Sequence, residues 1–469
     1  MRLILQSMKT TIKKIKNPAI VNTAIYGCGL LTVYLLFVGP GGYTAILQNK
    51  YAMFVASTGL YLLALTVVKK GGHIQNQWFD PARIAILLFA GFSALSTILS
   101  PYWKEALLGA GRREGLITLL LYVLIFMGFS TYGFSLRLLA YTSGASMTIF
   151  CLIAVLQLDG RNPLMLYPNG MNYFGAGTDY MWEYLGTIGN VDLVAALMSL
   201  FIPLYLLYVF LQKEDPWRFF LLVPLTLCTV VTAKMGVLAA FCALSGGAVL
   251  SIPVLLGNHK REQKASALAI VAAVICLIIG LKLFDAGDGL FHELHEILNG
   301  RISGNFGSQR VAIWQQVWEV IRERPIFGSG PDTLSLWGKG FEGYDKSIQA
   351  QITTVIDAAH NEYLNIWANE GVLALIAYLA ALVYLAWEWI RNGVKDTRIT
   401  ICGCSILCYC IQAFFGMSSC MTAPYFWMVL GMLSQGLSQI LCKHRNAVQI
   451  EQNLFKAEVA QAAAALISK

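Results

Sequence analysis

Charged side chains are scarce in this chain. Asp, Glu, Lys and Arg make up 13% of its 469 residues, whereas a soluble domain carries about 25%. Hydrophobic residues make up 57% of the sequence. So little charge is atypical of a water-soluble domain, and the composition therefore indicates a protein embedded in a membrane.

Several signatures of soluble enzymes are missing as well. No G-x-x-x-x-G-K-[ST] loop for nucleotide phosphates occurs, and the glycines of "GAGRREG" do not follow a soluble strand. His292 and His295 form H-x-x-H instead of the H-E-x-x-H of zinc proteases, which indicates the polar face of a surface helix. No cysteine falls in 285–363, so this segment has no disulfide framework. The sequence therefore points to neither a metal site nor a nucleotide cofactor.

What the chain does contain is a series of long apolar runs joined by tight links. A helix that spans a bilayer needs roughly 20 mostly apolar residues. The sequence predicts one all-α integral membrane domain over residues 1–445, with about twelve transmembrane helices. These helices are predicted at residues 19–38, 51–68, 84–99, 116–130, 137–158, 191–211, 217–232, 236–256, 266–284, 364–390, 398–415 and 424–441.

Lysine and arginine are distributed unevenly between the loops. The N-terminal stretch "MRLILQSMKTTIKKIK" is basic and precedes an apolar run without a small-residue cleavage site, so we interpret it as a retained anchor that starts in the cytoplasm. With that start, most basic residues fall in short cytoplasmic loops, as expected of membrane proteins. The net charge of +8 is therefore an orientation signal and no evidence for nucleic acid. Both termini are predicted to be cytoplasmic, including a short helical tail over 446–469.

The longest loop is predicted on the extracytoplasmic side, between the ninth and tenth helices, over 285–363. It contains an amphipathic stretch at 289–298 and a helical pattern in "SQRVAIWQQVWEVIRERP" that ends at Pro325. Further outer loops are expected at about 100–115 and 159–190. Long loops tend to carry function, so we expect the chemistry on the outer face.

One histidine stands where this outer loop meets the tenth predicted helix, in "DAAHNEYLNIWANEG". Helical spacing predicts that His360 shares one helix face with Tyr363 and Trp367. Histidine is the side chain best suited to accept a proton near neutral pH, so His360 is the candidate catalytic base. Asn361 beside it is a candidate substrate-binding residue. The alternative is a histidine at a helix start that satisfies only local backbone groups.

Basic residues recur at the outer edge of the predicted membrane domain, namely Arg112, Arg113, Lys234, Arg301 and Arg310. A charge at the edge of the hydrocarbon is costly unless it is paired or used. Guanidinium groups bind phosphate oxygens in bidentate fashion and lysine binds them as a point charge. These five residues are therefore candidates for binding a phosphate or pyrophosphate. The alternative is ion pairing with Glu114, Asp179, Glu183 or the acids of the long loop.

Four motifs make the chain similar to the O-antigen ligases and polymerases, a family of membrane transferases that act on lipid-linked glycans. They are "GAGRREGLITLLLY", "LGTIGNVDLVAALMSLFIP", "RVAIWQQVWEVIRERPIFGSGPDTL" and "AHNEYLNIWANEGVLALIAYL". The last two occur in this order between the ninth and tenth predicted helices. About twelve spans with a large outer loop after the ninth also resemble this family. The resemblance covers about 100–430.

The resemblance implies that a glycan moves from undecaprenyl pyrophosphate to a hydroxyl of a lipid or glycan acceptor, on the outer face of the bacterial cell (inner) membrane. It implies that His360 is the base, that Arg310 is the loop arginine that holds the pyrophosphate, and that no metal is needed. Lys234 in "TAKMG" stands where family members often have the arginine of a Ser-Arg-Gly step. Lysine keeps the charge but loses the fork geometry. Ligase and polymerase share this donor chemistry.

A transporter or flippase is the alternative from another class of protein, because twelve spans also suit it. It predicts two similar halves with interrupted helices and charges near the midplane of the membrane. No such symmetry is visible in the sequence, and 285–363 has no counterpart in the first half. A structural scaffold is a third alternative. We therefore predict a metal-independent membrane glycosyltransferase of the O-antigen ligase type, with membrane lipid and glycan as its partners.

Overall fold

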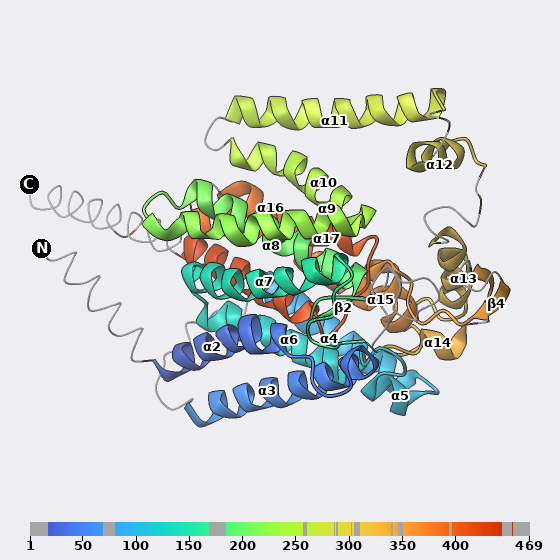
Figure 1. Ribbon diagram of the computed structural model, residues 1–469, viewed down its shortest axis with the longest axis horizontal. Coiled ribbons are helices and arrows are strands. Elements are labelled where there is room, and N and C mark those ends of the chain that lie inside the picture. Colours follow the sequence, from blue (N-terminus) through green and yellow to red (C-terminus); the bar gives the residue numbers. More distant parts are fainter. Residues whose placement is uncertain are drawn as a thin grey trace, which may run out of the picture.

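The protein is a bundle of helices that run side by side along its long axis (Figure 1). A computed structural model describes residues 17–68, 80–167, 184–256, 260–285, 287, 289–301, 303, 310–338, 341–345, 350–393, 396–442 and 453. Its α-helices are α2 (Pro18–Gly29), α3 (Ile46–Val68), α4 (Pro81–Leu99), α5 (Trp103–Leu108), α6 (Leu116–Tyr132), α7 (Leu136–Leu158), α8 (Val191–Leu211), α9 (Leu222–Met235), α10 (Leu238–Leu255), α11 (Lys260–Leu283), α12 (Gly289–Leu298), α13 (Arg310–Glu323), α14 (Leu334–Trp337), α15 (Glu362–Glu370), α16 (Val372–Asn392), α17 (Thr397–Ala413) and a last helix over 423–442. A π-helical segment η1 (Leu30–Tyr34), 3-10 helices η2 (Gly42–Ala45) and η3 (Pro216–Leu221), and two hairpins, β1 (Tyr184–Leu185) with β2 (Gly189–Asn190) and β3 (Phe341–Asp345) with β4 (Ala350–Thr354), complete the described elements.

Each of the predicted transmembrane segments overlaps a helix of the structure. Within the described part of the chain, eight helices are long and apolar enough to cross a bilayer. Shorter apolar helices lie at Pro18–Tyr34, Leu116–Tyr132 and Thr397–Ala413. The helical membrane-protein class is therefore confirmed, with two short hairpins that the sequence analysis did not foresee. Twelve crossings, and the side on which each loop lies, remain predictions. The tail over 446–469 lies almost wholly outside the described residues.

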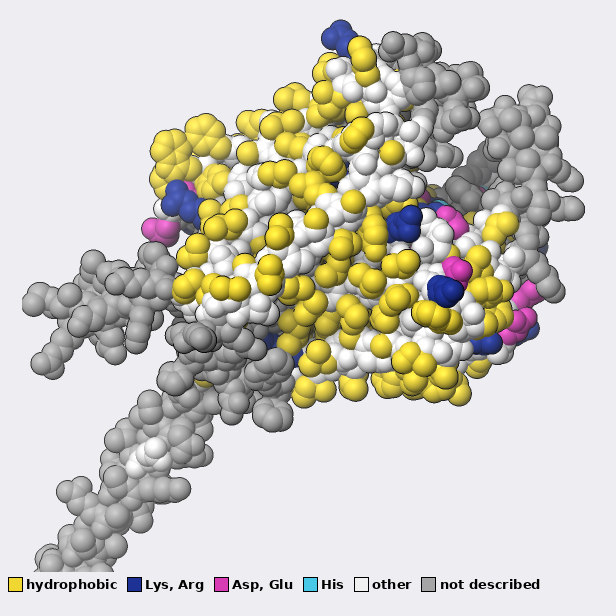
Figure 2. All heavy atoms as spheres, turned by 90° about the horizontal axis from the view of Figure 1, so that it is seen from below, with side chains coloured by type: hydrophobic (Ala, Val, Ile, Leu, Met, Phe, Trp, Pro, Cys, Tyr) yellow, Lys and Arg dark blue, Asp and Glu magenta, His cyan; other side chains and the backbone are white. Residues whose placement is uncertain are grey.

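Apolar side chains cover the outside of the bundle as well as its inside. Leu60 is 68% exposed, and Val67 and Ile98 are each 74% exposed. Figure 2 shows such side chains spread along the flank, with charged side chains gathered towards the two ends. A large exposed apolar surface indicates contact with lipid. One of the two ends carries α5, α12, α13, α14, α15 and the β3–β4 hairpin (Figure 1), and is called the loop end below.

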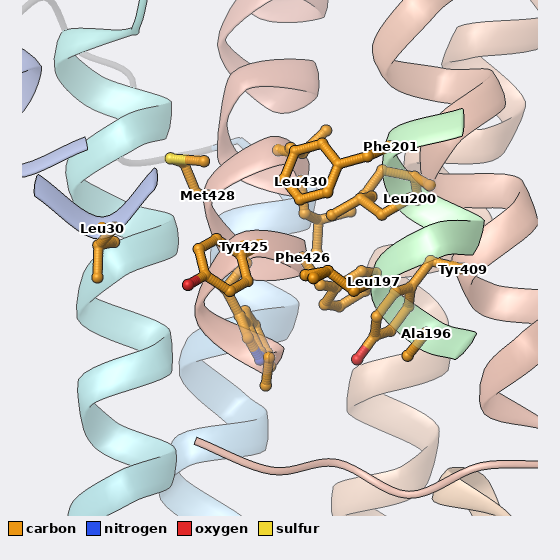
Figure 3. Packing of buried hydrophobic residues seen from close by; sticks show 14 of the residues in the cluster. Leu30, Ala196, Leu197, Leu200, Phe201, Tyr409, Tyr425, Phe426, Met428 and Leu430 are labelled. Carbon is orange, nitrogen blue, oxygen red and sulfur yellow. The ribbon is translucent and has the colours of Figure 1, made fainter. Parts of the chain in front are cut away.

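The interior of the bundle is packed around α8. Leu197 and Phe201 of α8 lie among aromatic side chains of α17 and the helix 423–442 (Figure 3). The rings of Tyr409 and Phe426 stack with centroids 4.4 Å apart, and those of Phe201 and Tyr425 meet edge to face at 6.1 Å. Interdigitated aromatic side chains of this kind hold a helix in one position. The packing of α8 therefore fixes the position of its first turn at the loop end.

The long loop contains three complete helices among its described residues, α12, α13 and α14. Both patterns predicted there are confirmed, because α12 covers 289–298 and α13 ends two residues before Pro325. A small second core packs α13 against α15. Its buried residues are Val317, Ile321, Leu334, Ile356, Ala359 and Ala368. The rings of Trp318 and Trp367 meet edge to face at 5.3 Å, and Trp314 Nε1 donates a hydrogen bond of 2.9 Å to the carbonyl of Ala359. This packing brings the start of α13 close to the start of α15.

The tenth predicted helix is not continuous, and in this respect the prediction was wrong. It is divided at Gly371, whose φ of 89° ends α15 and begins α16. The loop after α13 takes up backbone groups at the break: Ser329 N donates to the carbonyl of Ala368 (3.0 Å) and Val372 N donates to that of Pro325 (3.0 Å). Helix ends need such partners. The break is thus stabilised by a segment distant in the sequence, whose backbone groups form hydrogen bonds with the two helix ends.

The break gives a test of the fold. A Cβ at Gly371 would lie 2.2 Å from the carbonyl oxygen of Ile326, and its positive φ is unfavourable for other residues. We expect Gly371→Ala to destabilise the protein by at least about 1–3 kcal/mol of backbone strain, seen as a lower thermal midpoint in detergent. The control is Gly91→Ala in α4, where an added Cβ meets nothing within 4 Å. Equal midpoints for the two variants would contradict this account of the break.

Candidate functional site

His360 lies just before α15 and not on it, so the expected shared helix face with Tyr363 and Trp367 was wrong. The helix begins at Glu362 because Asn361 is its N-cap, with Oδ1 accepting a hydrogen bond of 3.0 Å from Leu364 N. His360 has a φ of 48°, which is uncommon for a residue other than glycine. The capped helix on one side and the Trp314 contact to the carbonyl of the preceding residue on the other hold this conformation. A role of Asn361 in substrate binding stays a prediction.

A carboxylate that the sequence analysis did not single out lies between the predicted base and the predicted loop arginine. Asp192 Oδ2 is 3.7 Å from His360 Nδ1, and Asp192 Oδ1 is 3.8 Å from Arg310 Nη2. The three side chains are between 19% and 26% exposed. Both partners are at ion-pair distance, beyond that of a hydrogen bond. The structure thus brings together two of the predicted site residues on one acid.

Asp192 is positioned by the first turn of α8. Asn190 is the N-cap, and its Oδ1 accepts hydrogen bonds from Asp192 N at 2.9 Å and Leu193 N at 3.3 Å. Gln412 of α17 donates from Nε2 to the carbonyl of Asp192 at 3.2 Å. An acid in the first turn also suits the positive end of the helix dipole. The "GNVDL" pattern of a cap could have located this turn, but no sequence signal shows which loops meet it.

Two of the predicted phosphate-binding residues contact acids elsewhere. Lys234 Nζ is 2.8 Å from Asp159 Oδ1, and both side chains are about half exposed. Arg301 Nη2 is 2.7 Å from Glu296 Oε1 of α12. Neither residue contacts the Asp192 group. Their roles in binding substrate stay predictions.

The two arginines of "GAGRREG" also have partners. Arg112 makes a bidentate ion pair with Asp357, with Nε at 2.9 Å and Nη2 at 3.0 Å from the two carboxylate oxygens. The guanidinium of Arg113 lies over the ring of Tyr51, 5.8 Å from its centroid. For Arg112, as for Arg301, the alternative of pairing with acids of the long loop is therefore realised. Two other acids considered as partners, Asp179 and Glu183, lie outside the described residues.

The loop that carries Arg112 is folded around Asp332. Oδ2 of Asp332 accepts hydrogen bonds from the backbone N–H groups of Gly111 (3.1 Å), Arg112 (2.9 Å) and Glu114 (3.3 Å). Burial raises the pKa of the Asp332 carboxyl, and these N–H groups oppose that rise. Asp332 is thus a structural acid that ties the turn after α13 to the start of α6.

A small cavity of about 40 Å3 lies beside this loop. Its lining includes Arg112 and five acids, namely Glu114, Asp332, Asp357, Glu362 and Glu370. Neither His360 nor Arg310 lines it. The cavity therefore does not join the candidate base to Arg310.

Burial raises the pKa of Glu114 to about 8 and that of Glu362 to about 7. Hydroxyl donors partly oppose this effect: Tyr122 donates to Glu114 Oε1 and Tyr378 donates to Glu362 Oε1, each at 2.8 Å. Both glutamates are less than 9% exposed. Protonation of these two carboxyls near neutral pH is therefore linked to the stability of the fold.

The sign of this linkage gives a prediction for Glu362. Because its pKa is raised in the folded state, the stabilising contribution is complete below the ordinary value of 4.5 and is lost as the pH rises through about 7. In the presence of a chelator, we expect the thermal midpoint to fall between pH 5 and pH 8, and Glu362→Gln to reduce that fall. The control is Glu105→Gln on the exposed face of α5. An identical pH dependence in wild type and Glu362→Gln would refute the prediction.

A second group of titratable side chains lies at α12. Asp285, His292 and Glu296 each place one possible ligand atom within 4.8 Å of the others. His292 Nδ1 is 2.7 Å from Asp285 Oδ1, and Glu296 pairs with Arg301. These partners account for both acids without a metal ion. The predicted independence of the chemistry from metal stays a prediction.

The sequence is similar to parts of other proteins. A protein of Haemophilus influenzae described as uncharacterized is 24% identical over 239 residues, which cover 46% of this chain and 54% of that protein. The teichuronic acid biosynthesis protein TuaE of Bacillus subtilis is 19% identical over 355 residues, which cover 72% of this chain and 69% of TuaE. The chain thus spans about half the length of the first relative and somewhat over two thirds of the second.

A family model adds a local match. The model described as O-antigen ligase matches residues 219–379. This segment runs from η3 into α16 and includes Lys234, Arg310 and His360. The matched segment does not include Asp192, although the fold places this residue beside Arg310 and His360. In this segment the chain is therefore similar to the O-antigen ligase family, and its apolar helices indicate a multi-pass membrane protein.

Proposed function

We propose that this protein is a membrane glycosyltransferase that moves a glycan from undecaprenyl pyrophosphate to a hydroxyl of a lipid or glycan acceptor. The observation that carries the proposal is the convergence of His360 and Arg310 on Asp192 at the loop end. The O-antigen ligase match and the teichuronic acid relative support a role in polysaccharide biosynthesis. The proposal places the reaction on the outer face of the bacterial cell membrane, where a carrier lipid stays in the bilayer and its glycan lies in water.

The three residues divide the chemistry between them. The acceptor hydroxyl gives its proton to Nε2 of His360, while Nδ1 faces the Asp192 carboxylate at 3.7 Å. A carboxylate beside the second nitrogen fixes the tautomer and stabilises the imidazolium that forms. Such contacts commonly tighten once substrate is bound. His360 thus acts as the general base and Asp192 as the residue that orients it.

The bond changes balance with these roles. The acceptor oxygen forms a bond to the anomeric carbon as the bond from that carbon to the pyrophosphate oxygen breaks, and the electron pair leaves with the pyrophosphate. Arg310 binds the departing phosphate oxygens through its guanidinium fork. A preorganised cation at a developing charge supplies a large part of the lowering of the barrier. Asp192 neutralises this arginine until the substrate phosphate takes its place.

Among Lys234, Arg112 and Arg301, Lys234 needs the least energy to exchange its acid partner for a substrate phosphate. Its ion pair with Asp159 is about half exposed, and an exposed pair contributes little to stability. A phosphate can therefore displace the acid at small cost. Arg112 is held by a bidentate pair and Arg301 by Glu296, so their use would require breaking those contacts.

The test is a transfer assay with purified protein in lipid and an undecaprenyl-pyrophosphate-linked glycan. Transfer is expected with one of two acceptors, and a chelator should leave the initial rate within about twofold of the untreated rate. A ligase adds one glycan to a lipid A core acceptor, whereas a polymerase extends a second lipid-linked glycan into a ladder. Movement of the donor across the bilayer without transfer would instead identify a flippase and overturn the proposal.

A variant of Asp192 tests the orienting role. We expect Asp192→Asn to lower kcat by about 10–10²-fold, a part of what general base catalysis contributes, with a smaller change in KM. The Asp192→Asn and His360→Gln double variant should be no slower than His360→Gln alone, because the acid acts through the base. Asp285→Asn, an exposed acid outside the site, is the control. Multiplying losses in the double variant would show that Asp192 acts independently of His360.

A further inference from the structure

The cavity beside the Arg112 loop contains far more acid than base. Among its lining residues, Arg112 is paired with Asp357, and Asp332 is satisfied by three backbone N–H groups. Three glutamates, Glu114, Glu362 and Glu370, line the same space. The lining thus holds several acidic groups and one basic residue, Arg112, which already forms an ion pair with Asp357.

The hydrogen bonds to the first two glutamates come from neutral donors, which for Glu114 include the backbone of Cys420. Glu114 accepts hydrogen bonds from Tyr122 at 2.8 Å and from Ser418 at 3.2 Å, and Glu362 accepts one from Tyr378 at 2.8 Å. A hydroxyl satisfies a lone pair of a carboxylate but leaves its charge in place. Burying such a charge is costly unless a cation or a proton compensates it.

Glu370 provides the observation that points to a ligand. It is 5% exposed, and its Oε2 is buried without a hydrogen-bond partner in the structure. It is also the last residue of α15, where the helix dipole disfavours negative charge. Buried polar atoms are nearly always satisfied, so an orphaned carboxylate oxygen at a cavity indicates a missing partner.

Size and spacing narrow the choice of partner. The cavity has room for the centres of only a few water molecules, which excludes a sugar or a lipid headgroup. Within the described residues, the only three His, Cys, Asp or Glu side chains whose ligand atoms lie within 4.8 Å of one another are those at α12, so the cavity glutamates are further apart. Mg2+ keeps several waters and is bound through one or two carboxylates, and Ca2+ accepts carboxylates together with water. An ion that keeps part of its water shell can therefore interact with carboxylates that are too far apart to coordinate one ion directly.

We propose that this cavity binds one hard divalent cation of the Mg2+ or Ca2+ type, with Glu370 as a direct ligand and with Glu114 and Glu362 around its water shell. The ion links the start of α6 to α15 and so stabilises the packing of these two elements. It lies outside the Asp192 group and takes no part in glycan transfer.

Terbium luminescence gives a direct test, because Tb3+ replaces Ca2+ at oxygen sites and is excited by nearby aromatic rings. Trp427, Tyr122 and Tyr378 line the cavity. The full-length protein, washed with chelator in detergent, is titrated with Tb3+. We expect sensitised emission that Ca2+ and Mg2+ reduce by competition. Glu370→Gln, which keeps the shape of the side chain, should weaken apparent Tb3+ affinity by at least about tenfold, equal to about 1.4 kcal/mol.

Two controls keep the result interpretable. Asp285→Asn alters the group at α12, and Glu105→Gln alters an exposed acid on α5; both should leave the emission unchanged. Thermal unfolding of the wild type provides an independent readout, with a midpoint that rises when Mg2+ or Ca2+ is added and a smaller rise in Glu114→Gln. Emission that persists in both Glu370→Gln and Glu114→Gln, emission lost only in Asp285→Asn, or a wild-type midpoint indifferent to both cations would each show that the cavity holds only protons and water.

Discussion

Replacing His360 with glutamine is expected to reduce glycan transfer by about 10²–10⁴-fold, the contribution that a positioned general base makes. The loss should fall mainly on kcat, because glutamine keeps a polar side chain of similar reach but cannot accept a full proton. Asp192 would then face an uncharged amide, and Arg310 would remain in place. The measurement is the initial rate of transfer from a lipid-linked glycan at saturating donor.

The matched control for this variant is His292→Gln on α12. His292 belongs to the same long loop and also lies beside an acid, with its Nδ1 2.7 Å from Asp285 Oδ1, but it is outside the proposed site. A rate close to that of the wild type is expected for this control. Should His360→Gln fold normally and transfer within a few-fold of the wild-type rate, the base would have to be another group.

Replacing Arg310 with alanine is expected to lower kcat/KM by about 10²–10³-fold, as does the loss of one preorganised donor at a developing charge. Arg310→Lys should recover only part of this loss, because lysine retains the charge without the bidentate fork. The same assay measures both variants, with donor concentration varied so that binding and turnover are separated. A double variant with Asp192→Asn removes the acid that Arg310→Ala would leave uncompensated beside the incoming phosphate.

Arg322→Ala is the control for this experiment, because Arg322 lies on the same helix but turns to the ring of Trp318, 5.9 Å from its centroid. It is exposed, and we expect little change in kcat/KM. An equal loss in Arg322→Ala and Arg310→Ala would mean that the helix as a whole had been disturbed. Full recovery in Arg310→Lys would mean that only charge matters at this position.

Local patterns predicted much of the fold. The boundaries of α12 and the end of α13 follow from apolar spacing and from Pro325, because helix formation depends on neighbours three and four residues apart. The apolar runs predicted the membrane helices for the same reason. The prediction of a continuous tenth helix was wrong. The break at Gly371 is stabilised by backbone groups of the loop after α13, and local patterns do not reveal such distant contacts.

The sequence predicted the residues of the candidate site better than it predicted their contacts. His360 and Arg310 were predicted to act together, and the structure brings both to one acid. The grouping of Lys234 and Arg301 with them rested on charge and side of the membrane alone, and each contacts a local acid instead. Loops of one side share a surface but need not share a site, because ion pairs form with whichever partner the local backbone presents.

By itself the sequence determined that this protein lies in a membrane and where most of its helices run. Only the tertiary structure decided that Asp192 meets His360 and Arg310, and that the glutamates around Glu370 line one cavity. The physical reason is the range of the interactions. Helices form from contacts within a few residues, whereas Asp192 and Glu114 each lie more than one hundred residues from the groups that they meet once the helices pack.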